Sequence, residues 1–171
     1  MNKYSIITLT ATAVIITAVT YSGFSVLGAN QLEYRWHNPS DFSFFTMSNH
    51  GQMEFCNTLP FWISFQKFEI ITFYDEENMG VLTIDQMTIN PLSSVVKEGV
   101  FSSTEFTSAQ HIFMTLDFEF DGGDIRLDPN KLIVVIRVDT PIIGIIPYTT
   151  TTQISGFDFD QNMNAEDLTC D

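Results

Sequence analysis

Two pairs of residues have types and spacings that could support catalysis. Ser94 and Lys97 have the S-x-x-K spacing of penicillin-binding enzymes, where a helix brings the lysine back to the serine. On a strand, residues three apart point to opposite faces, and the companion motifs of those enzymes are missing from the sequence. Asp117 and Glu119 would be neighbouring carboxylates on one strand face, as in a glycosidase pair. Exposed acidic strand faces are far commoner, so we predict that the protein is not an enzyme.

Potential metal ligands are present without the spacing of a known metal site. Four of them could in principle hold zinc, but their intervals fit no standard motif. They are His37, His50, Cys56 and His111. Residues 158–169 begin like an EF-hand loop, yet Met163 stands where the loop needs Gly, and Thr169 where it needs Glu. We expect no metal and no cofactor, and leave open weak calcium binding by the acidic surface.

The charge balance restricts the classes of partner. Among 171 residues, 21 are acidic and 7 are Lys or Arg, which gives a formal net charge of −14. All of the acidic residues and six of the basic ones follow residue 28, so this later part carries −15. Such a surface repels phosphate backbones and anionic lipid head groups. Nucleic acid is therefore excluded as a partner.

Four residues are candidates for a disulfide or a binding site. Cys56 and Cys170 could form a disulfide in an oxidising exterior, closing a loop of about 115 residues. Alternatively, Cys56 is a buried thiol, while Cys170 is free or pairs with another chain. Phe61 and Trp62 lie in the aromatic stretch LPFWISF. If exposed, they would form a patch that binds a partner.

An apolar run at the N-terminus precedes all of these candidate residues. Lys3 is the only charged side chain before Glu33, and Ile6–Leu27 is long enough to cross a bilayer as a helix. Residues 1–28 are predicted to be a transmembrane anchor or a signal peptide, which could be cut near Val26–Gly28. The positive-inside rule places the N-terminus inside and the domain outside the membrane. A cleaved signal peptide would instead give a secreted protein.

Residues 29–159 have the pattern of an all-β extracytoplasmic domain. Short apolar or alternating runs are separated by turn residues, without a sustained helical period. The clearest run, 113–120, alternates so that Phe118 is expected in the core and Glu119 in water. Other strands are predicted over 42–47, 53–57, 65–74, 81–89, 93–101, 131–140 and 148–154. A two-sheet, immunoglobulin- or fibronectin-like β-sandwich would bury this many amphipathic strands.

Expectations for three further regions complete the predicted fold. Residues 102–111 could form about one helical turn, with Ser102 and Glu105 as a capping box. The acidic tail, residues 160–171, is expected to be loosely ordered. The apolar, threonine-rich stretch 140–159 is expected to close the fold as an edge-like strand with its hydroxyls outward.

The order of the turns resembles that of the late-embryogenesis-abundant, water-stress (WHy) type of β-sandwich. Residues 45–157 contain the corresponding breaks: Asn57, Pro60 and Phe61, then Gly80, then Pro91, Ser93 and Ser94, and finally Gly144 and Pro147. Cys56 and the strongly aromatic strands depart from that pattern. The resemblance implies a binding, membrane-proximal or stress-protective role and no shared catalytic residues.

We therefore expect a non-enzymatic, membrane-anchored, extracytoplasmic module of the cell envelope with an unidentified protein partner. Two alternatives remain open. The protein could be an accessory subunit of a membrane complex, in which its apolar helix packs against other helices. It could also be a secreted hydrolase, which would need a polar pocket with converging titratable groups.

Overall fold

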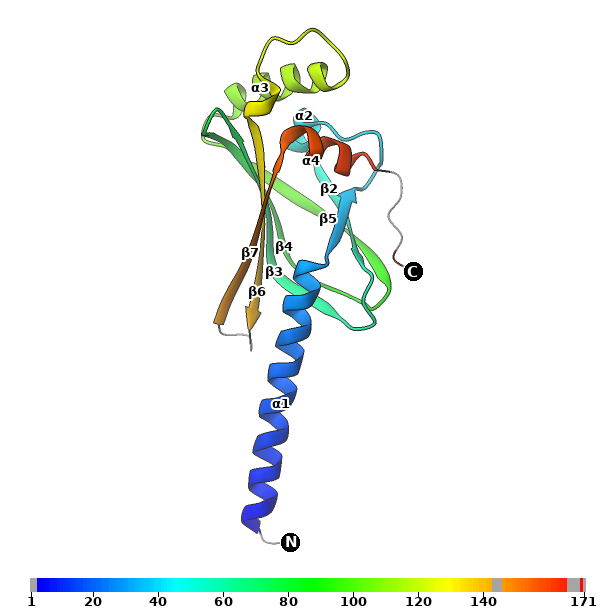
Figure 1. Ribbon diagram of the computed structural model, residues 1–171, viewed down its shortest axis with the longest axis vertical. Coiled ribbons are helices and arrows are strands. Elements are labelled where there is room, and N and C mark those ends of the chain that lie inside the picture. Colours follow the sequence, from blue (N-terminus) through cyan, green and yellow to red (C-terminus); the bar gives the residue numbers. More distant parts are fainter. Residues whose placement is uncertain (1–2, 143–145, 166–169, 171) are drawn as a thin grey trace.

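The computed structural model describes residues 3–142, 146–165 and 170, and it shows a mainly β domain carried on a long N-terminal helix (Figure 1). Helix α1 (Lys3–Asn30) contains several threonines, which are poor helix formers. Their hydroxyls donate to carbonyls four residues earlier, as Thr10 does to Ile6 and Thr17 does to Ala13. The helix thus satisfies its own polar groups without water.

Seven antiparallel strands form one curled sheet in the order β1-β2-β5-β4-β3-β6-β7. The strands are β1 (Glu33–Trp36), β2 (Gly51–Asn57), β3 (Ile63–Tyr74), β4 (Glu77–Ile89), β5 (Ser93–Ser102), β6 (Leu132–Ile142) and β7 (Ile146–Ser155). Strand β5 makes the bend, because residues 93–99 pair with β2 whereas residues 100–102 pair with β4. The prediction of a mainly β fold is confirmed, but the two-sheet sandwich is not.

The hydrophobic core lies inside the bend of the sheet. Phe55 on β2 packs against Phe65 and Phe68 on β3, with ring centroids 5.8 and 5.0 Å away. On β6, alternate residues such as Val134 and Val138 are buried, as the alternation of its sequence predicts. The aromatic richness of the chain is therefore used to fill the space between two halves of one sheet.

Three short helices cover the end of the domain that lies away from α1 (Figure 1). They are α2 (Phe44–Asn49), α3 (Phe106–Phe120) and α4 (Gly156–Met163), and a 3-10 turn, η1 (Pro129–Lys131), precedes β6. Phe44 is fully buried where they meet. Its ring lies within about 6 Å of four other aromatic rings, those of Phe42, Phe113, Phe120 and Phe159.

Two of the predicted strands are helices. Residues 113–120 belong to α3, and residues 42–47 overlap α2. The buried positions of α3 have helical spacing: Ala109, Phe113, Leu116 and Glu119. Because a helical period sets the buried face, Phe118 is 54% exposed and Glu119 only 8%. The expected orientation of these two side chains was therefore wrong.

Two further expectations need correction. The single turn expected within 102–111 is instead the start of α3, a helix of 15 residues. The tail expected to be loosely ordered begins inside α4, whose N-cap Ser155 accepts a hydrogen bond from the Asp158 N–H, and Phe159 is fully buried. Residues 166–169 and 171 of this tail lie outside the described residues, as does Gly144.

Candidate functional site

Helix α1 consists of an exposed half and a docked half. Nearly every side chain from Tyr4 to Thr20 is exposed, whereas Ser22, Ser25 and Gly28 are buried against the domain. By length and composition, α1 is sufficiently long and apolar to cross a membrane. The exposed half projects away from the domain (Figure 1), so nothing in the described chain covers its apolar surface.

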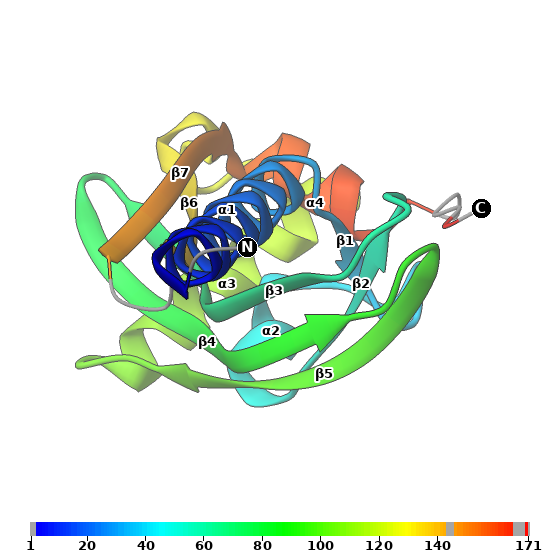
Figure 2. The ribbon, with the colours of Figure 1, turned by 90° about the horizontal axis from the view of Figure 1, so that it is seen from below.

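Small residues allow the docked half of α1 to lie close to the sheet. The Ser25 hydroxyl is satisfied by the Tyr21 carbonyl within the helix. A Cβ atom added to Gly28 would lie 2.1 Å from Cγ2 of Ile63, so a larger residue there would force Ile63 or the helix to shift. Viewed from below, this end of α1 lies between β6 and β7 on one side and β1 and α4 on the other (Figure 2). It thereby helps to close the open side of the curled sheet.

A ring stack and a hydrogen bond fix the first docked turn of α1 to the loop before β3 and to the start of that strand. The rings of Phe24 and Phe61 are stacked with their centroids 4.4 Å apart. The Tyr21 hydroxyl lies 3.2 Å from the Ser64 Oγ. Of the predicted aromatic patch, Phe61 is thus half-buried by α1, whereas Trp62 is 58% exposed.

Asn57 holds together the two loops beside the docked helix. Its side chain is buried, and its Nδ2 donates hydrogen bonds to the carbonyls of Phe61 (2.8 Å) and Asn90 (2.9 Å). Its Oδ1 accepts a hydrogen bond from the Leu59 N–H at 3.0 Å. Strand β2 can therefore end at Asn57, because this one amide side chain gives the backbone groups of both loops the hydrogen bonds that strand pairing would otherwise supply.

Where α1 joins the domain lie the loops 58–62 and 90–92 and the ends of β6 and β7, at Ile142 and Ile146. They lie at the same end because Ile63 pairs with Ile89, and β6 runs antiparallel to β3. Neither these two loops nor the segment 141–148 contains a charged residue. We call their exposed or half-exposed apolar side chains the uncharged rim. Its members are Trp62, Leu92, Ile142 and Ile146.

Carboxylates gather at the opposite end of the domain. Asp117 on α3 accepts hydrogen bonds from the N–H groups of Phe44 and Phe45, each at 2.8 Å, and so holds the start of α2. Burial raises the pKa of Asp117 to about 6, although these backbone hydrogen bonds oppose the shift. Burial, followed by the charges of Asp117 and Asp121, raises the pKa of Asp160 to about 6.

The side chains whose spacing could suggest catalysis are Asp117, Glu119, Ser94 and Lys97, and the two carboxylates bind backbone N–H groups. Asp117 caps α2, and Glu119 accepts hydrogen bonds from the N–H groups of Arg126 and Leu127. These bonds hold the loop after α3 against that helix. Ser94 and Lys97 lie on β5, where Lys97 lines a cleft of about 600 Å³ with polar side chains of β3 and β4. The two carboxylates thus serve as braces for backbone segments.

The histidines that could in principle bind zinc lie on different elements. His37 follows β1, His50 caps the end of α2, and His111 lies in α3. Within residues 3–142, 146–165 and 170, no group of three or more His, Cys, Asp and Glu side chains is placed to hold a metal ion. Asp158 and Asp160, which begin the EF-hand-like segment, lie in α4 instead of a loop.

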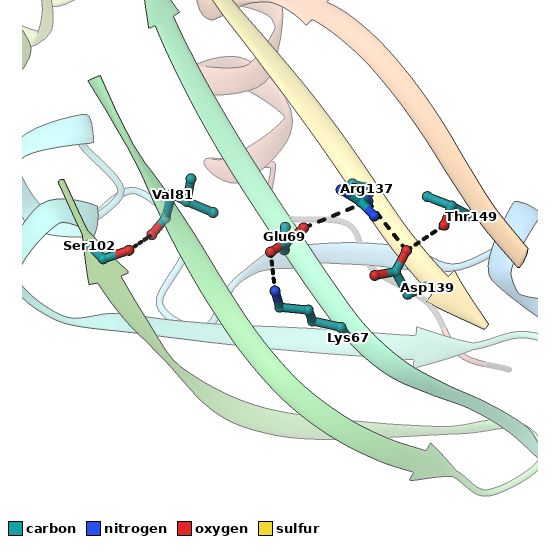
Figure 3. Close-up of polar contacts among 7 residues, drawn as sticks. All are labelled: Lys67, Glu69, Val81, Ser102, Arg137, Asp139 and Thr149. Carbon is teal, nitrogen blue, oxygen red and sulfur yellow. Dashed lines mark hydrogen bonds and ion pairs between the residues drawn. The ribbon is translucent and has the colours of Figure 1, made fainter. Parts of the chain in front are cut away.

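An ion-pair network crosses β3, β6 and β7 (Figure 3). Glu69 is 8% exposed and forms ion pairs with Lys67 on its own strand and with Arg137 on β6. Arg137 also pairs with Asp139 at 3.3 Å, and Asp139 accepts a hydrogen bond from the Thr149 hydroxyl at 2.6 Å. Two cations and two carboxylates balance each other, which links the edge strand to the middle of the sheet.

The two cysteines are joined in the structure. Cys56 on β2 and Cys170 form a disulfide with Cα atoms 5.5 Å apart, within the range that such a bond requires. Cys56 is fully buried and directly precedes Asn57. The bond therefore attaches the segment after α4 to β2, whose end lies beside the loop 58–62.

No protein-family model matches this chain, and no curated protein matches it. Among solved structures, a protein from Archaeoglobus fulgidus is similar at 10% identity, covering 72% of this chain and 94% of its own, with a TM-score of 0.34. A protein assigned provisionally to the late embryogenesis abundant (LEA) class is 14% identical, covering 87% of this chain and 89% of its own, with a TM-score of 0.28. Both scores are low, and we infer neither fold nor function from them.

Proposed function

We propose that this protein is a single-pass, membrane-anchored, extracytoplasmic β domain that serves as a non-enzymatic interaction module of a cell envelope. The observation that supports this most directly is the construction of α1. Its exposed apolar half, Tyr4–Thr20, continues without a linker into a half that is packed on the sheet. An apolar helix that is exposed on all sides requires a lipid or protein environment.

The docked half of α1 favours a retained anchor over a cleaved signal peptide. Cleavage near Gly28 would remove the Phe24 ring from Phe61 and the Tyr21 hydroxyl from Ser64. It would also uncover the side of the sheet that the end of α1 occupies. A signal peptide that is removed has no reason to complete the packing of the mature domain.

The direction of insertion follows from charge. Lys3 precedes the apolar stretch, and the acidic excess follows it. The positive-inside rule then places the N-terminus in the cytoplasm and the β domain outside. A disulfide between Cys56 and Cys170 suits the same side of the membrane, because exteriors are oxidising.

A role as an accessory subunit of a membrane complex is the second candidate. Thr10, Ala13 and Thr17 are exposed on α1 and recur at helical spacing. Small side chains of this kind allow close contact between membrane helices. Copurification of a second membrane protein in mild detergent would favour this form of the proposal.

A matched pair of substitutions tests the anchor. Val14 on α1 is 64% exposed, and Val100 on β5 is 72% exposed. An arginine near the middle of a spanning helix costs about 2.5–3.5 kcal/mol of insertion free energy. We expect Val14→Arg to shift the full chain from alkaline-washed membranes into the soluble fraction, whereas Val100→Arg leaves it in the membranes.

Protease added outside intact cells tests the orientation. The β domain should be digested while the first residues stay protected. A domain that resists protease until the cells are permeabilised would contradict the proposed orientation. Wild-type protein that is released by the alkaline wash would contradict the anchor itself.

A further inference from the structure

We infer that the uncharged rim rests in the interfacial layer of the bilayer that α1 spans, so that lipid contacts the domain as well as the helix. This inference rests on the proposed anchor. It gives lipid as the ligand of a surface for which the proposed function specifies no role. The rim comprises Trp62, Leu92, Ile142 and Ile146, and it adjoins the docked half of α1.

The length of the exposed helix brings the domain to the membrane. Tyr4–Thr20 contains 17 residues, which span about 25 Å at 1.5 Å per residue. The hydrocarbon core of a typical bilayer is about 30 Å thick. Because the exposed half is shorter than the core, hydrocarbon must reach the first docked turn of α1, which begins at Tyr21.

The contacts of that turn place the rim at the same depth. Tyr21 reaches Ser64 at the start of β3, and Phe24 stacks on Phe61, the residue before Trp62. The loop 58–62 is therefore held beside the part of α1 where hydrocarbon ends and head groups begin. A domain fixed to the helix in this way has no free linker that could lift the loop away from lipid.

The side chains of the rim suit an interfacial environment. The Trp62 Nε1–H donates to Asn90 Oδ1 at 3.2 Å, which satisfies its polar edge and leaves 58% of the residue exposed. Tryptophan with an apolar body and a satisfied or wet polar edge is enriched at membrane interfaces. Trp62 therefore presents apolar ring surface without an unpartnered donor.

Leu92 supports the same assignment because its position is conformationally costly. Its φ is +48°, in the left-handed region that favours Gly or Asn, and its side chain is 53% exposed. Its N–H donates to the Leu59 carbonyl at 3.2 Å, which ties the two loops together. A turn alone would be better served by Gly, so the outward leucine is consistent with a surface that contacts lipid.

The distribution of charge permits this approach. The chain has 21 acidic residues, yet 58–62, 90–92 and 141–148 contain none. Acidic side chains would be repelled by anionic head groups and would be costly to dehydrate. The end of the domain beside α1 is thus the one that can approach a bilayer closely.

Fluorescence quenching by brominated lipids tests the inference. The chain has two tryptophans, and Trp36 is only 5% exposed. Full-length protein would be placed one copy per nanodisc, in phosphatidylcholine that is unbrominated, brominated near the head group or brominated near the chain ends. The same measurement on Trp62→Phe isolates the contribution of Trp62, and this exposed position should tolerate the change.

We expect the emission of Trp62 to fall by roughly half with bromine near the head group, as expected for an interfacial ring, and less with bromine near the chain ends. The quenching should disappear in Trp62→Phe. Unquenched, red-shifted emission from protein that stays in the disc would overturn the inference, because the rim would then face water. If discs loaded instead with two copies gave blue-shifted, unquenched emission while single-copy discs did not, this would also overturn it, by assigning the rim to a second copy. Failure of the wild-type protein to enter discs would refute the anchor instead.

Discussion

The end of the domain beside α1 and the end covered by the three short helices perform the same structural task with opposite chemistry. Beside α1, the amide of Asn57 holds two loops by bonding to their backbone groups. At the far end, carboxylates do this work, with Asp117 holding α2 and Glu119 holding the loop after α3. A neutral brace can be dehydrated at lower cost than a charged one. The choice of brace therefore matches the solvent proposed for each end.

The loops themselves follow the same division. The turn 75–76 consists of two acidic residues, and the loop 121–131 contains three aspartates. The loops 58–62 and 90–92 contain no charge, although they belong to the same small domain. Net charge alone would not reveal this difference, because it comes from which strand ends the topology brings together.

Loss of the disulfide is expected to have the largest effect on stability. This bond connects the segment after α4, at the far end, to the end of β2 beside α1. Cys56 and Cys170 are 114 positions apart. Loss of a crosslink over so long a loop costs about 2–5 kcal/mol of unfolding free energy. We expect Cys170→Ser to lose this amount in chemical unfolding of the detergent-solubilised protein, and reductant to have the same effect on the wild type.

The controls for this prediction use the thiols directly. Reductant should leave the stability of Cys170→Ser unchanged. Non-reducing peptide mapping of native protein should yield one peptide pair that contains both cysteines. Two alkylatable thiols in the unreduced protein would contradict the intramolecular bond, and a covalent dimer would assign Cys170 to another chain.

Replacing the neutral brace is expected to have the next largest effect. Asn57→Ala removes the partner of the Phe61 and Asn90 carbonyls and of the Leu59 N–H. Leaving several such groups unpaired near the core should lower the free energy of unfolding by about 2–3 kcal/mol. Asn130→Ala is the matched control at the far end, since its side chain is exposed and, among the described residues, bonds to Asp128, the N-cap of η1.

The control should change stability by less than about 0.5 kcal/mol. A better discriminator is protease sensitivity of the loop 58–62, which should rise in Asn57→Ala and stay unchanged in Asn130→Ala. Equal stability losses in the two variants would mean that the loops beside α1 are held by other contacts.

Removing a carboxylate that holds the far end should lower the free energy of unfolding by a smaller amount. Glu119→Ala removes the acceptor for the N–H groups of Arg126 and Leu127, so we expect a loss of about 1–3 kcal/mol. Phe118 is its neighbour on the solvent side of α3 and is 54% exposed. Phe118→Ala should therefore cost less than about 1 kcal/mol in the same unfolding assay. The reverse order would restore the strand register that the sequence suggests.

The sequence predicts most of the sheet because period-two alternation and β-branched residues are local signals. Predicted strands 65–74, 81–89 and 131–140 lie within β3, β4 and β6 or overlap them by all but one residue. Strand β1 escapes prediction, since Glu33–Trp36 is short and gains its regularity from pairing with β2. Helix α3 escapes because Met114, Leu116, Phe118 and Phe120 alternate with other residues as on a strand. In the folded chain the helical spacing of Phe113 and Leu116 sets the buried face, and Phe113 packs against Phe44.

The candidate site is less predictable than the sheet. The sequence identifies Trp62 as a possible contact residue, because it stands in an aromatic stretch. It does not show that Phe61 lies under Phe24, or that Asn57 reaches Asn90 across 33 positions. The first contact depends on where α1 docks, which the close approach of Gly28 to Ile63 allows, and the second depends on the pairing of distant strands. Long-range packing of this kind leaves no periodic signal in the sequence.

The smallest predicted effect is a pH dependence confined to the acidic end. The folded pKa of Asp160 is raised from 3.8 to about 6 by burial and by the charges of Asp117 and Asp121. A carboxyl whose pKa is higher in the folded state contributes stability below about pH 4, and loses it as pH rises through 6. Asp160→Asn should match the wild type at pH 4 and be more stable by roughly 1 kcal/mol at pH 7.5, after allowance for the partial exposure of this side chain.

Asp124→Asn removes an equal charge from an exposed loop at the same end and should keep the wild-type profile. Asp117 will leave part of the slope in Asp160→Asn, because burial raises its pKa as well. Thermal unfolding across this range tests the prediction: if Asp160→Asn runs parallel to the wild type, burial and the neighbouring carboxylates do not raise the folded pKa of Asp160, and the contrast with the neutral end lies in sequence alone.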